Sequence, residues 1–220
     1  MSSLIFWDVD TQYDFMKPDG KLYIPRAEAI IPTLERLTAY AHAKGIRIVA
    51  SADDHSPGDR ELSETPDFVT SYPVHCMRGT PGQARLAETA LNNPIVIEPE
   101  PQDPETLAAR ITVHRGDILF NKHWFDVFSN ANVDTVLRIL NPDVIVMYGV
   151  ALDVCNKYAI EGLLNHRPQT KLYLVTDATK AIRFEVGEHL LRDWGDEGVR
   201  LVRAEEILED GILDRYLRAG

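Results

Sequence analysis

Several side chains capable of chemistry follow short apolar runs of this sequence. In chain order they are Asp10, Asp53, His55, Lys122 and Cys155. A thiol beside a carboxylate can act as a nucleophile whose proton the carboxylate removes, and a nearby ammonium group can hold the negative charge that develops. The set therefore predicts nucleophilic catalysis by cysteine, and it leaves imidazole and carboxylate groups over for a metal ion.

Cys155 is the strongest candidate for the nucleophile. It follows the segment Gly-Val-Ala-Leu-Asp and stands at the start of a predicted helix, 154–165, for which Asp153 is the expected N-cap. The N-terminus of a helix favours a thiolate, and its free N–H groups can hold an oxyanion. The alternative is that Cys155 is a small buried hydrophobic residue, as many free cysteines are.

A carboxylate and a lysine are available to serve this thiol. Asp10 could remove the thiol proton, or it could simply form a turn. Asp8 competes with it, because alternation along a strand places both side chains on the same side, and spacing alone does not choose between them. Lys122 lies between Phe120 and Trp124, where an ammonium group must be paired or reach water.

A second group of residues has the composition of a metal site. Asp53 and His55 form an Asp-x-His pair, and His75 follows twenty residues later. Two imidazoles and a carboxylate suit Zn²⁺, Fe²⁺ or Mn²⁺, although each histidine alone could be structural. Cys76 could ligate a soft metal, but packing is the favoured interpretation. A metal here would polarise a ring nitrogen or bound water rather than form the nucleophile.

The elements that must position these residues alternate between strands and helices. Short, continuously apolar runs occupy 4–9, 46–50, 95–97, 118–120, 144–148, 172–175 and 201–202. Such runs are typical of strands covered on both faces. Helical patterns occupy 27–44, 131–140, 154–165 and 183–194. The alternation predicts an α/β fold of three αβα layers, with an open, mostly parallel sheet of about six strands and helices on both faces. The chemical residues would then share the carboxyl edge of the sheet.

One long segment has neither periodicity. Residues 52–82 are rich in Pro, Gly, Ser, Thr and Asp, and they include His55, Phe68, Tyr72 and His75. Structureless segments of this length are uncommon in compact domains unless they are functional or disordered. We interpret the segment as an ordered loop that binds metal and substrate.

Composition excludes several classes of protein. The 220 residues carry 23 Lys and Arg against 34 Asp and Glu, a formal charge of −11. An acidic chain without a basic stripe is a poor partner for nucleic acid, and its longest apolar runs are too short to span a bilayer. We expect a single domain over 1–220. The absence of a basic, apolar leader and the two cysteines, taken as free thiols, predict a cytoplasmic protein.

Five separated blocks resemble the isochorismatase-like cysteine hydrolases, and within them the nicotinamidase/pyrazinamidase group, from about residue 4 to residue 179. The blocks are DTQYDF at 10–15, DDH at 53–55, YPVHC at 72–76 followed by Gly79-Thr80, FNK at 120–122 and GVALDVC at 149–155.

The resemblance assigns roles to these residues. It implies a catalytic triad of Asp10 rather than Asp8, with Lys122 and Cys155, and a cis peptide before Ala151. The oxyanion hole would be the N–H groups of Ala151 and Cys155.

The resemblance also implies a metal and a substrate site. Asp53, His55 and His75 would hold a divalent ion, zinc foremost, with iron or manganese as alternatives. Phe15 and Tyr72 would sandwich a pyridine ring, although the family usually has Trp at the Tyr72 position. A further ligand is common in this loop. Glu61 could supply it and Arg60 could not.

The resulting hypothesis is hydrolysis of nicotinamide to nicotinate and ammonia through a thioester on Cys155. The alternatives are another small amide, ureide or vinyl ether, or a member whose site has decayed. A more distant one is a phosphatase of the haloacid dehalogenase type, because Asp8-Val9-Asp10 mimics its motif, although Gln12 does not fit. Apolar rims around Phe125 and Phe128 would allow a homo-oligomer, which relatives commonly form.

Overall fold

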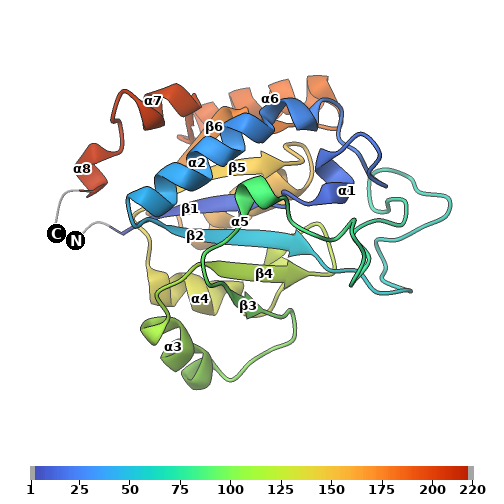
Figure 1. Cartoon of the computed structure of the whole chain (residues 1–220), viewed down its shortest axis with the longest axis horizontal. Helices are drawn as coiled ribbons and strands as arrows, with labels where there is room; N and C mark the ends of the chain where they lie inside the picture. The colour runs from blue at the N-terminus through green and yellow to red at the C-terminus, as the bar shows by residue number, and fades with distance from the viewer. Residues whose placement is uncertain (1–2, 218–220) are drawn as a thin grey trace.

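The computed structural model describes residues 3–217, and a sheet of seven parallel strands runs through its centre (Figure 1). The strands are β1 (Leu4–Val9), β2 (Arg47–Asp53), β3 (Ile95–Ile97), β4 (Ile118–Lys122), β5 (Val144–Val150), β6 (Lys171–Lys180) and β7 (Arg200–Val202). Their order across the sheet is β3-β4-β2-β1-β5-β6-β7. The predicted α/β class is confirmed, with one strand more than the six expected.

Helices connect the strands and cover the sheet. The α-helices are α1 (Tyr13–Met16), α2 (Ile31–Ala43), α3 (Pro104–Val113), α4 (Val133–Leu140), α5 (Cys155–His166), α6 (Phe184–Asp196), α7 (Ala204–Leu208) and α8 (Asp214–Leu217). Three 3₁₀ turns are η1 (Ala27–Ile30), η2 (Ala87–Thr89) and η3 (Val127–Ser129). Helix α2 packs on α7, whereas α3 packs on α4 (Figure 1). The sequence pattern predicted α2, α4, α5 and α6, and it missed the short helices α1, α7 and α8 and the longer α3. The apolar stripe of α3 is only Leu107 and Ile111.

The end of α2 shows how the sequence sets a boundary. Gly45 adopts a left-handed conformation, with φ of +65°. Its N–H donates to the His42 carbonyl at 3.1 Å, and the N–H of Ile46 donates to the Ala41 carbonyl at 2.8 Å. These two bonds satisfy the last carbonyls of the helix and turn the chain into β2.

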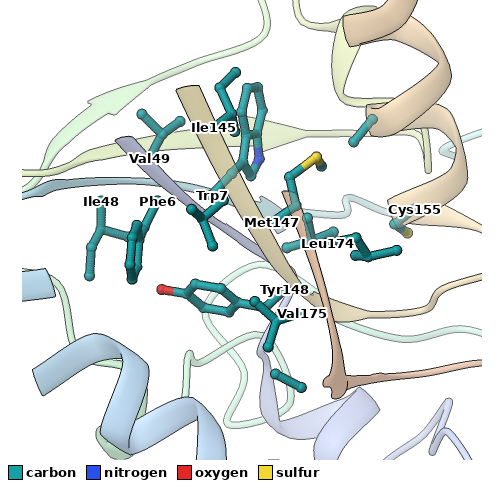
Figure 2. Close-up of a cluster of buried hydrophobic side chains, with 14 of the residues drawn as sticks. Phe6, Trp7, Ile48, Val49, Ile145, Met147, Tyr148, Cys155, Leu174 and Val175 are labelled. Atoms are coloured by element: carbon teal, nitrogen blue, oxygen red, sulfur yellow. The ribbon is translucent and has the colours of Figure 1, made fainter. Parts of the chain in front are cut away.

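The core explains why the strands are continuously apolar. All seven residues of β5 are buried, because helices cover both faces of the sheet. Phe6 of β1 lies beside Tyr148 of β5 within this core, and the next residue, Trp7, points to the opposite face of the sheet (Figure 2). The Phe6 and Tyr148 rings meet edge to face, with centroids 6.0 Å apart. The middle of the sheet is therefore a rigid support for whatever its edges carry.

The connections reverse direction between β1 and β5. Strand β2, which follows β1 in the chain, pairs with one edge of β1. Strand β5 pairs with the other edge of β1, and β6 and β7 continue the sheet on that side. In open α/β sheets a crevice forms at such a point, beyond the carboxyl ends of the strands. Asp53 and Lys122, expected just after strands 46–50 and 118–120, are the last residues of β2 and β4 and lie opposite each other in the ladder.

Within residues 3–217 no helix combines the length and the apolar character that crossing a membrane requires.

Candidate active site

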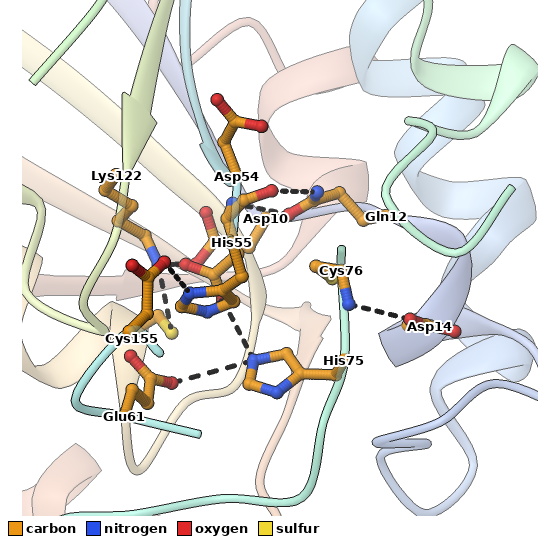
Figure 3. Close-up of polar contacts among 12 residues, drawn as sticks. Asp10, Gln12, Asp14, Asp54, His55, Glu61, His75, Cys76, Lys122 and Cys155 are labelled. Atoms are coloured by element: carbon orange, nitrogen blue, oxygen red, sulfur yellow. Dashed lines mark hydrogen bonds and ion pairs between the residues drawn. The ribbon is translucent and has the colours of Figure 1, made fainter. Parts of the chain in front are cut away.

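The carboxyl edge of the sheet brings together the residues singled out in the sequence (Figure 3). Asp10 follows β1, Asp53 ends β2, Lys122 ends β4, and Cys155 begins α5 beyond β5. All strands are parallel, so these ends meet on one side. The convergence predicted from five separated segments is what the fold produces.

A close approach between β1 and β5 shapes the segment before the nucleophile. Gly149 has a φ of +110°, and a Cβ on it would lie 2.1 Å from the carbonyl oxygen of Val9. Only glycine fits there. The peptide bond between Val150 and Ala151 is cis, as the family resemblance implies. The chain then makes one turn and enters α5 at Cys155.

The predicted N-cap of α5 is wrong. Val154 occupies the cap position and no side chain caps the helix. The buried Asp153 carboxylate instead accepts hydrogen bonds from the N–H groups of Ile182 and Arg183, at 2.8 and 2.9 Å. It thereby ties the nucleophile segment to the segment after β6, whose Ile182 lines the pocket beside Cys155. Neither partner could be inferred from the sequence, because they lie about thirty positions away.

Lys122 is the centre of the nucleophile half of the site. Its Nζ lies 2.9 Å from Oδ2 of Asp10 and 3.7 Å from Sγ of Cys155, and it also pairs with Asp53. A carboxylate oxygen of Asp10 and the sulfur lie within 4.8 Å of each other. The Ser51 hydroxyl, which the sequence did not single out, donates to Oδ1 of Asp10 at 2.6 Å. The ammonium group of Lys122 can stay charged although it is buried, because it lies between the carboxylates of Asp10 and Asp53.

The pKa shifts in this half have clear causes. Burial raises the pKa of Cys155 well above its ordinary value, and the opposing charge of Lys122 does not offset it. Burial likewise raises the pKa of Asp10, against the charge of Lys122. Burial alone would lower the pKa of Lys122, but the charges of Asp10 and Asp53 raise it well above normal. The resting sulfur is therefore a thiol and not the preformed thiolate expected from the helix N-terminus, so it needs a base.

Asp8, the competing carboxylate, is engaged elsewhere. Its Oδ2 lies 2.5 Å from Nη2 of Arg85 and accepts a hydrogen bond from the Thr11 hydroxyl at 3.2 Å. It is fully buried in this ion pair. The geometry thus leaves Asp10 as the carboxylate beside the sulfur, and it gives no support to a phosphatase that would need both Asp8 and Asp10.

The turn before α5 carries the two backbone N–H groups that the family resemblance assigns to an oxyanion hole. The Ala151 carbonyl accepts from the N–H groups of Val154 and Asn156, at 3.1 and 3.0 Å, and so closes the turn before α5. In the part of the chain that the structure describes, the N–H groups of Ala151 and Cys155 donate to no protein acceptor. They are the two donors predicted for the oxyanion hole, and both residues line the pocket.

The metal half of the site contains four buried side chains, Asp53, His55, Glu61 and His75, whose ligand atoms all lie within 4.8 Å of one another. Nε2 of His75 lies 3.4 Å from Oδ2 of Asp53 and 3.6 Å from Oε1 of Glu61. Glu61 therefore lies where the sequence left a further ligand open, and Arg60 stacks on Trp124 instead.

These four residues fit a divalent cation. Oδ2 of Asp53, Nε2 of both histidines and Oε2 of Glu61 are buried without a hydrogen-bond partner among the described residues. The other imidazole nitrogens are engaged: Nδ1 of His55 lies 3.1 Å from Oδ2 of Asp59, and Nδ1 of His75 lies 2.7 Å from the Pro73 carbonyl oxygen. Outer partners of this kind aim Nε2 at a metal. Unpartnered buried ligand atoms are costly unless a cation satisfies them.

Electrostatics distinguishes the two carboxylates of this cluster. Burial would raise the pKa of Asp53, but Lys122 and the two imidazoles lower it well below its usual range. Burial, reinforced by the charge of Asp53, raises the pKa of Glu61 to about 7. Asp53 is therefore ionised before any metal binds, whereas Glu61 must lose a proton near neutral pH to become a ligand.

Gln12 fixes Asp53 from β1. Its Oε1 accepts from the Asp53 N–H at 2.7 Å, and its Nε2 donates to the Asp53 carbonyl at 2.8 Å (Figure 3). Asp53 then serves both halves, with Oδ1 on Lys122 and Oδ2 in the metal cluster. Gln12 appeared in the family block, but its partner could not be predicted from the sequence.

A small pocket separates the nucleophile from the metal cluster. Its wall includes both predicted substrate-binding residues, Phe15 and Tyr72, together with Cys155 and His75. The Phe15 ring lies 5.3 Å from the His75 ring, and the Tyr72 ring lies edge-on to His75 with centroids 6.5 Å apart. A flat ring in this pocket would have the Phe15 and Tyr72 rings beside it and would lie between the His75 imidazole and the sulfur.

Cys76, the alternative soft ligand, takes no part in the cluster. It is fully buried, and its sulfur contacts the Gly82 carbonyl oxygen at 3.8 Å. Its N–H donates to Oδ2 of Asp14 at 2.7 Å, which anchors the loop of residues 52–82 to the segment after β1. The packing interpretation of Cys76 agrees with this placement.

Comparison with known proteins places the chain among hydrolases. A family model described as the isochorismatase domain matches residues 3–206. The nicotinamidase/pyrazinamidase of Mycobacterium tuberculosis is 40% identical over 75 residues, which are 34% of this chain and 39% of that protein. The match thus spans well under half the length of that relative.

Two solved structures share the fold. Pyrazinamidase of Pyrococcus horikoshii, crystallised in complex with zinc, has a TM-score of 0.70 at 24% identity and covers 91% of this chain and 99% of its own. N-carbamoylsarcosine amidase of Thermoplasma acidophilum has a TM-score of 0.66 at 22% identity, with 94% and 98% covered.

Proposed function

We propose that this chain, which belongs to the isochorismatase family of hydrolases, is a cysteine amidohydrolase that converts nicotinamide to nicotinate and ammonia. The observation that carries the proposal is a pocket whose wall contains Cys155 and three members of the buried Asp/His/His/Glu cluster, Asp53, Glu61 and His75. Behind this wall, Lys122 contacts both Cys155 and Asp10. The names of the partial relative and of the zinc-bound structural neighbour support it.

Cys155 attacks the substrate carbonyl as Asp10 removes its proton. A carbon–sulfur bond forms, and the carbonyl electrons move to oxygen, where the N–H groups of Ala151 and Cys155 hold the charge. The ammonium group of Lys122, 3.7 Å from the sulfur, stabilises the developing thiolate. Asp10 needs to act as a base in this step because burial keeps the thiol protonated at rest.

The oxyanion then collapses and the carbon–nitrogen bond breaks. Asp10 returns its proton to the amide nitrogen, which leaves as ammonia, and a thioester on Cys155 remains. Asp10, again a carboxylate, takes a proton from water as the water oxygen attacks the thioester. The sulfur leaves with the electrons of the carbon–sulfur bond and regains the proton, and the carboxylic acid is released.

Asp53, His55 and His75, with Glu61 as a fourth ligand, would hold a divalent cation, zinc foremost and iron or manganese as alternatives. When bound, it supplies a Lewis-acid contact for a ring nitrogen of the substrate. Phe15 and Tyr72 flank the ring and exclude water from it. Together these groups orient the carboxamide towards Cys155.

A second candidate substrate is another small amide or a ureide. Tyr72 stands where the resembling family usually has Trp, so the wall that would face the pyridine has a different shape and a polar hydroxyl. The fold shared with N-carbamoylsarcosine amidase shows that this architecture occurs in an enzyme named for such a substrate.

Ammonia release from a substrate panel tests the proposal. The panel contains nicotinamide, pyrazinamide, N-carbamoylsarcosine and benzamide, which has the carboxamide but no ring nitrogen. We expect nicotinamide to react at least about 100-fold faster than benzamide, because only nicotinamide offers a ring nitrogen to the metal half.

Chelation, followed by elemental analysis, should remove both the metal and the preference for a ring nitrogen. Turnover of N-carbamoylsarcosine without turnover of nicotinamide would select the second candidate. No turnover of any amide by folded, metal-loaded protein would contradict the proposed amidohydrolase activity.

A further inference from the structure

A second hollow lies at the opposite edge of the sheet from the active site. It has a volume of about 660 Å³ and opens at the amino ends of β1, β2 and β4. In Figure 1 these ends lie at the left, whereas the loop of residues 52–82 lies at the right. No step of the proposed reaction uses this hollow.

Two arginines of its wall meet at one carbonyl oxygen. Nη2 of Arg47 donates to the His114 carbonyl at 2.5 Å, and Nη1 of Arg115 lies 3.4 Å from the same oxygen. Arg47 is the first residue of β2 and is half-buried, whereas Arg115 is exposed on the segment before β4. The fold thus holds two guanidinium groups side by side, although their positions in the sequence are far apart.

The wall of the hollow supplies only one carboxylate to balance the two charges of this pair. Among the residues lining the hollow only Asp117 is acidic. Its oxygens already accept from the N–H groups of Ile48 and Asn92 and contact Nε2 of His42, at 2.7 to 2.9 Å. Over residues 3–217 neither Arg47 nor Arg115 forms an ion pair with a carboxylate, in contrast to Arg85 with Asp8.

Capping of helix α3 does not account for both arginines. The two side chains donate to carbonyls at the end of this helix, those of Thr112 and His114. A helix C-terminus offers only about half of a negative charge, and one cation satisfies it. Burial and the nearby charge of Arg115 lower the pKa of Arg47, and the opposing charge of Asp117 does not offset them.

We propose that this hollow binds a small phosphate monoester, with the phosphate between Arg47 and Arg115. Guanidinium groups present paired N–H donors that match phosphate oxygens, and a dianion balances two positive charges. The rest of the wall includes Ile5, Ile46 and Ile111, against which the organic part of the ester would lie. The site is separate from the amide pocket and does not depend on the proposed reaction.

Isothermal titration calorimetry of the full-length, metal-loaded protein tests this proposal. Phenyl phosphate has both a phosphate dianion and an apolar ring. Inorganic phosphate has only the anion, and phenol has only the ring. We expect saturable binding of phenyl phosphate, weaker binding of inorganic phosphate and none of phenol. Equal affinities for phenyl phosphate and inorganic phosphate would overturn the assignment of an ester.

Substitution of single arginines tests where phenyl phosphate binds. Arg115→Gln and Arg47→Gln should each weaken phenyl phosphate binding by about tenfold or more, because each removes one bidentate contact to phosphate. Arg110→Gln, on α3, removes an equal charge from a side chain bonded to Gln102, outside the hollow, and should leave the affinity unchanged.

Arg115 is exposed, so its variant should fold even where the Arg47 variant does not. Wild-type affinity in the Arg115→Gln variant would place the anion elsewhere, for instance on the metal, and would overturn the proposal. Absence of saturable binding by the wild-type protein would do the same.

Discussion

The two halves of the active site are built differently. In the nucleophile half, the charge of Lys122 is paired with Asp10 and Asp53. In the metal half, four ligand atoms from Asp53, His55, Glu61 and His75 face one another without a hydrogen-bond partner among the described residues. The first arrangement is complete as the protein folds, and the second needs a cation to complete it. Asp53 belongs to both.

This difference separates catalysis from stability. Removing the nucleophile takes away a neutral thiol and leaves the paired charges intact, so folding should not suffer. Removing a metal ligand should weaken the binding of the cation. Because a bound cation stabilises the folded protein by mass action, the free energy of unfolding and the metal content should fall together.

The largest effect should come from Cys155→Ala. We expect ammonia release to fall by about 10⁴-fold or more, because no other described side chain can form the thioester. Cys76→Ala is the matched control, because this cysteine is equally buried but takes no part in the site. Thermal unfolding should show a folded Cys155→Ala protein. Retained turnover in that variant would refute the covalent route.

Asp53→Asn and His75→Ala distinguish the shared ligand from an unshared one. Both should lose bound zinc in elemental analysis. In metal-free protein, only Asp53→Asn should also lower the free energy of unfolding, by roughly 3 kcal/mol, because it removes one of two carboxylates from buried Lys122. Chemical denaturation of both metal-free variants measures this. Equal unfolding free energies would mean that Asp53 does not connect the halves.

The pH dependence of metal-free protein should report on Glu61. Its pKa of about 7 in the folded state exceeds the ordinary value of 4.5. The folded protein therefore binds this proton more tightly than the unfolded chain does. The resulting stability is present at low pH and is lost as pH rises through 7, by at most roughly 3 kcal/mol. In Glu61→Gln this slope should disappear. Unfolding midpoints measured from about pH 5 to pH 8 decide the point.

The smallest effect should follow Tyr72→Trp. This change supplies the aromatic residue usual in the resembling family and leaves both halves of the site unchanged. We expect KM for nicotinamide to fall by about three- to tenfold with little change in kcat, because ring stacking contributes about equally to the ground and transition states. A fall in kcat instead would show that the Tyr72 hydroxyl acts on the reacting groups.

The positions of the strands were easier to predict than the partners of the residues at their ends. Apolar runs located all seven strands, because a strand covered on both faces must be apolar throughout. Asp153 was expected to cap a helix, yet it binds the N–H groups of Ile182 and Arg183. Capping is a local preference, and a distant pair of unsatisfied donors outweighed it.

The sequence by itself determined the class of fold and the chemical types available at its edge. Those features follow from periodicity and from residue identity, which are local properties of the chain. Only the tertiary structure decided that Asp8 pairs with Arg85 while Asp10 faces the sulfur. It also decided that burial keeps Cys155 protonated and that Glu61 joins the metal cluster. Desolvation and charge pairing depend on which segments meet, and that information lies in the packing of distant strands and loops.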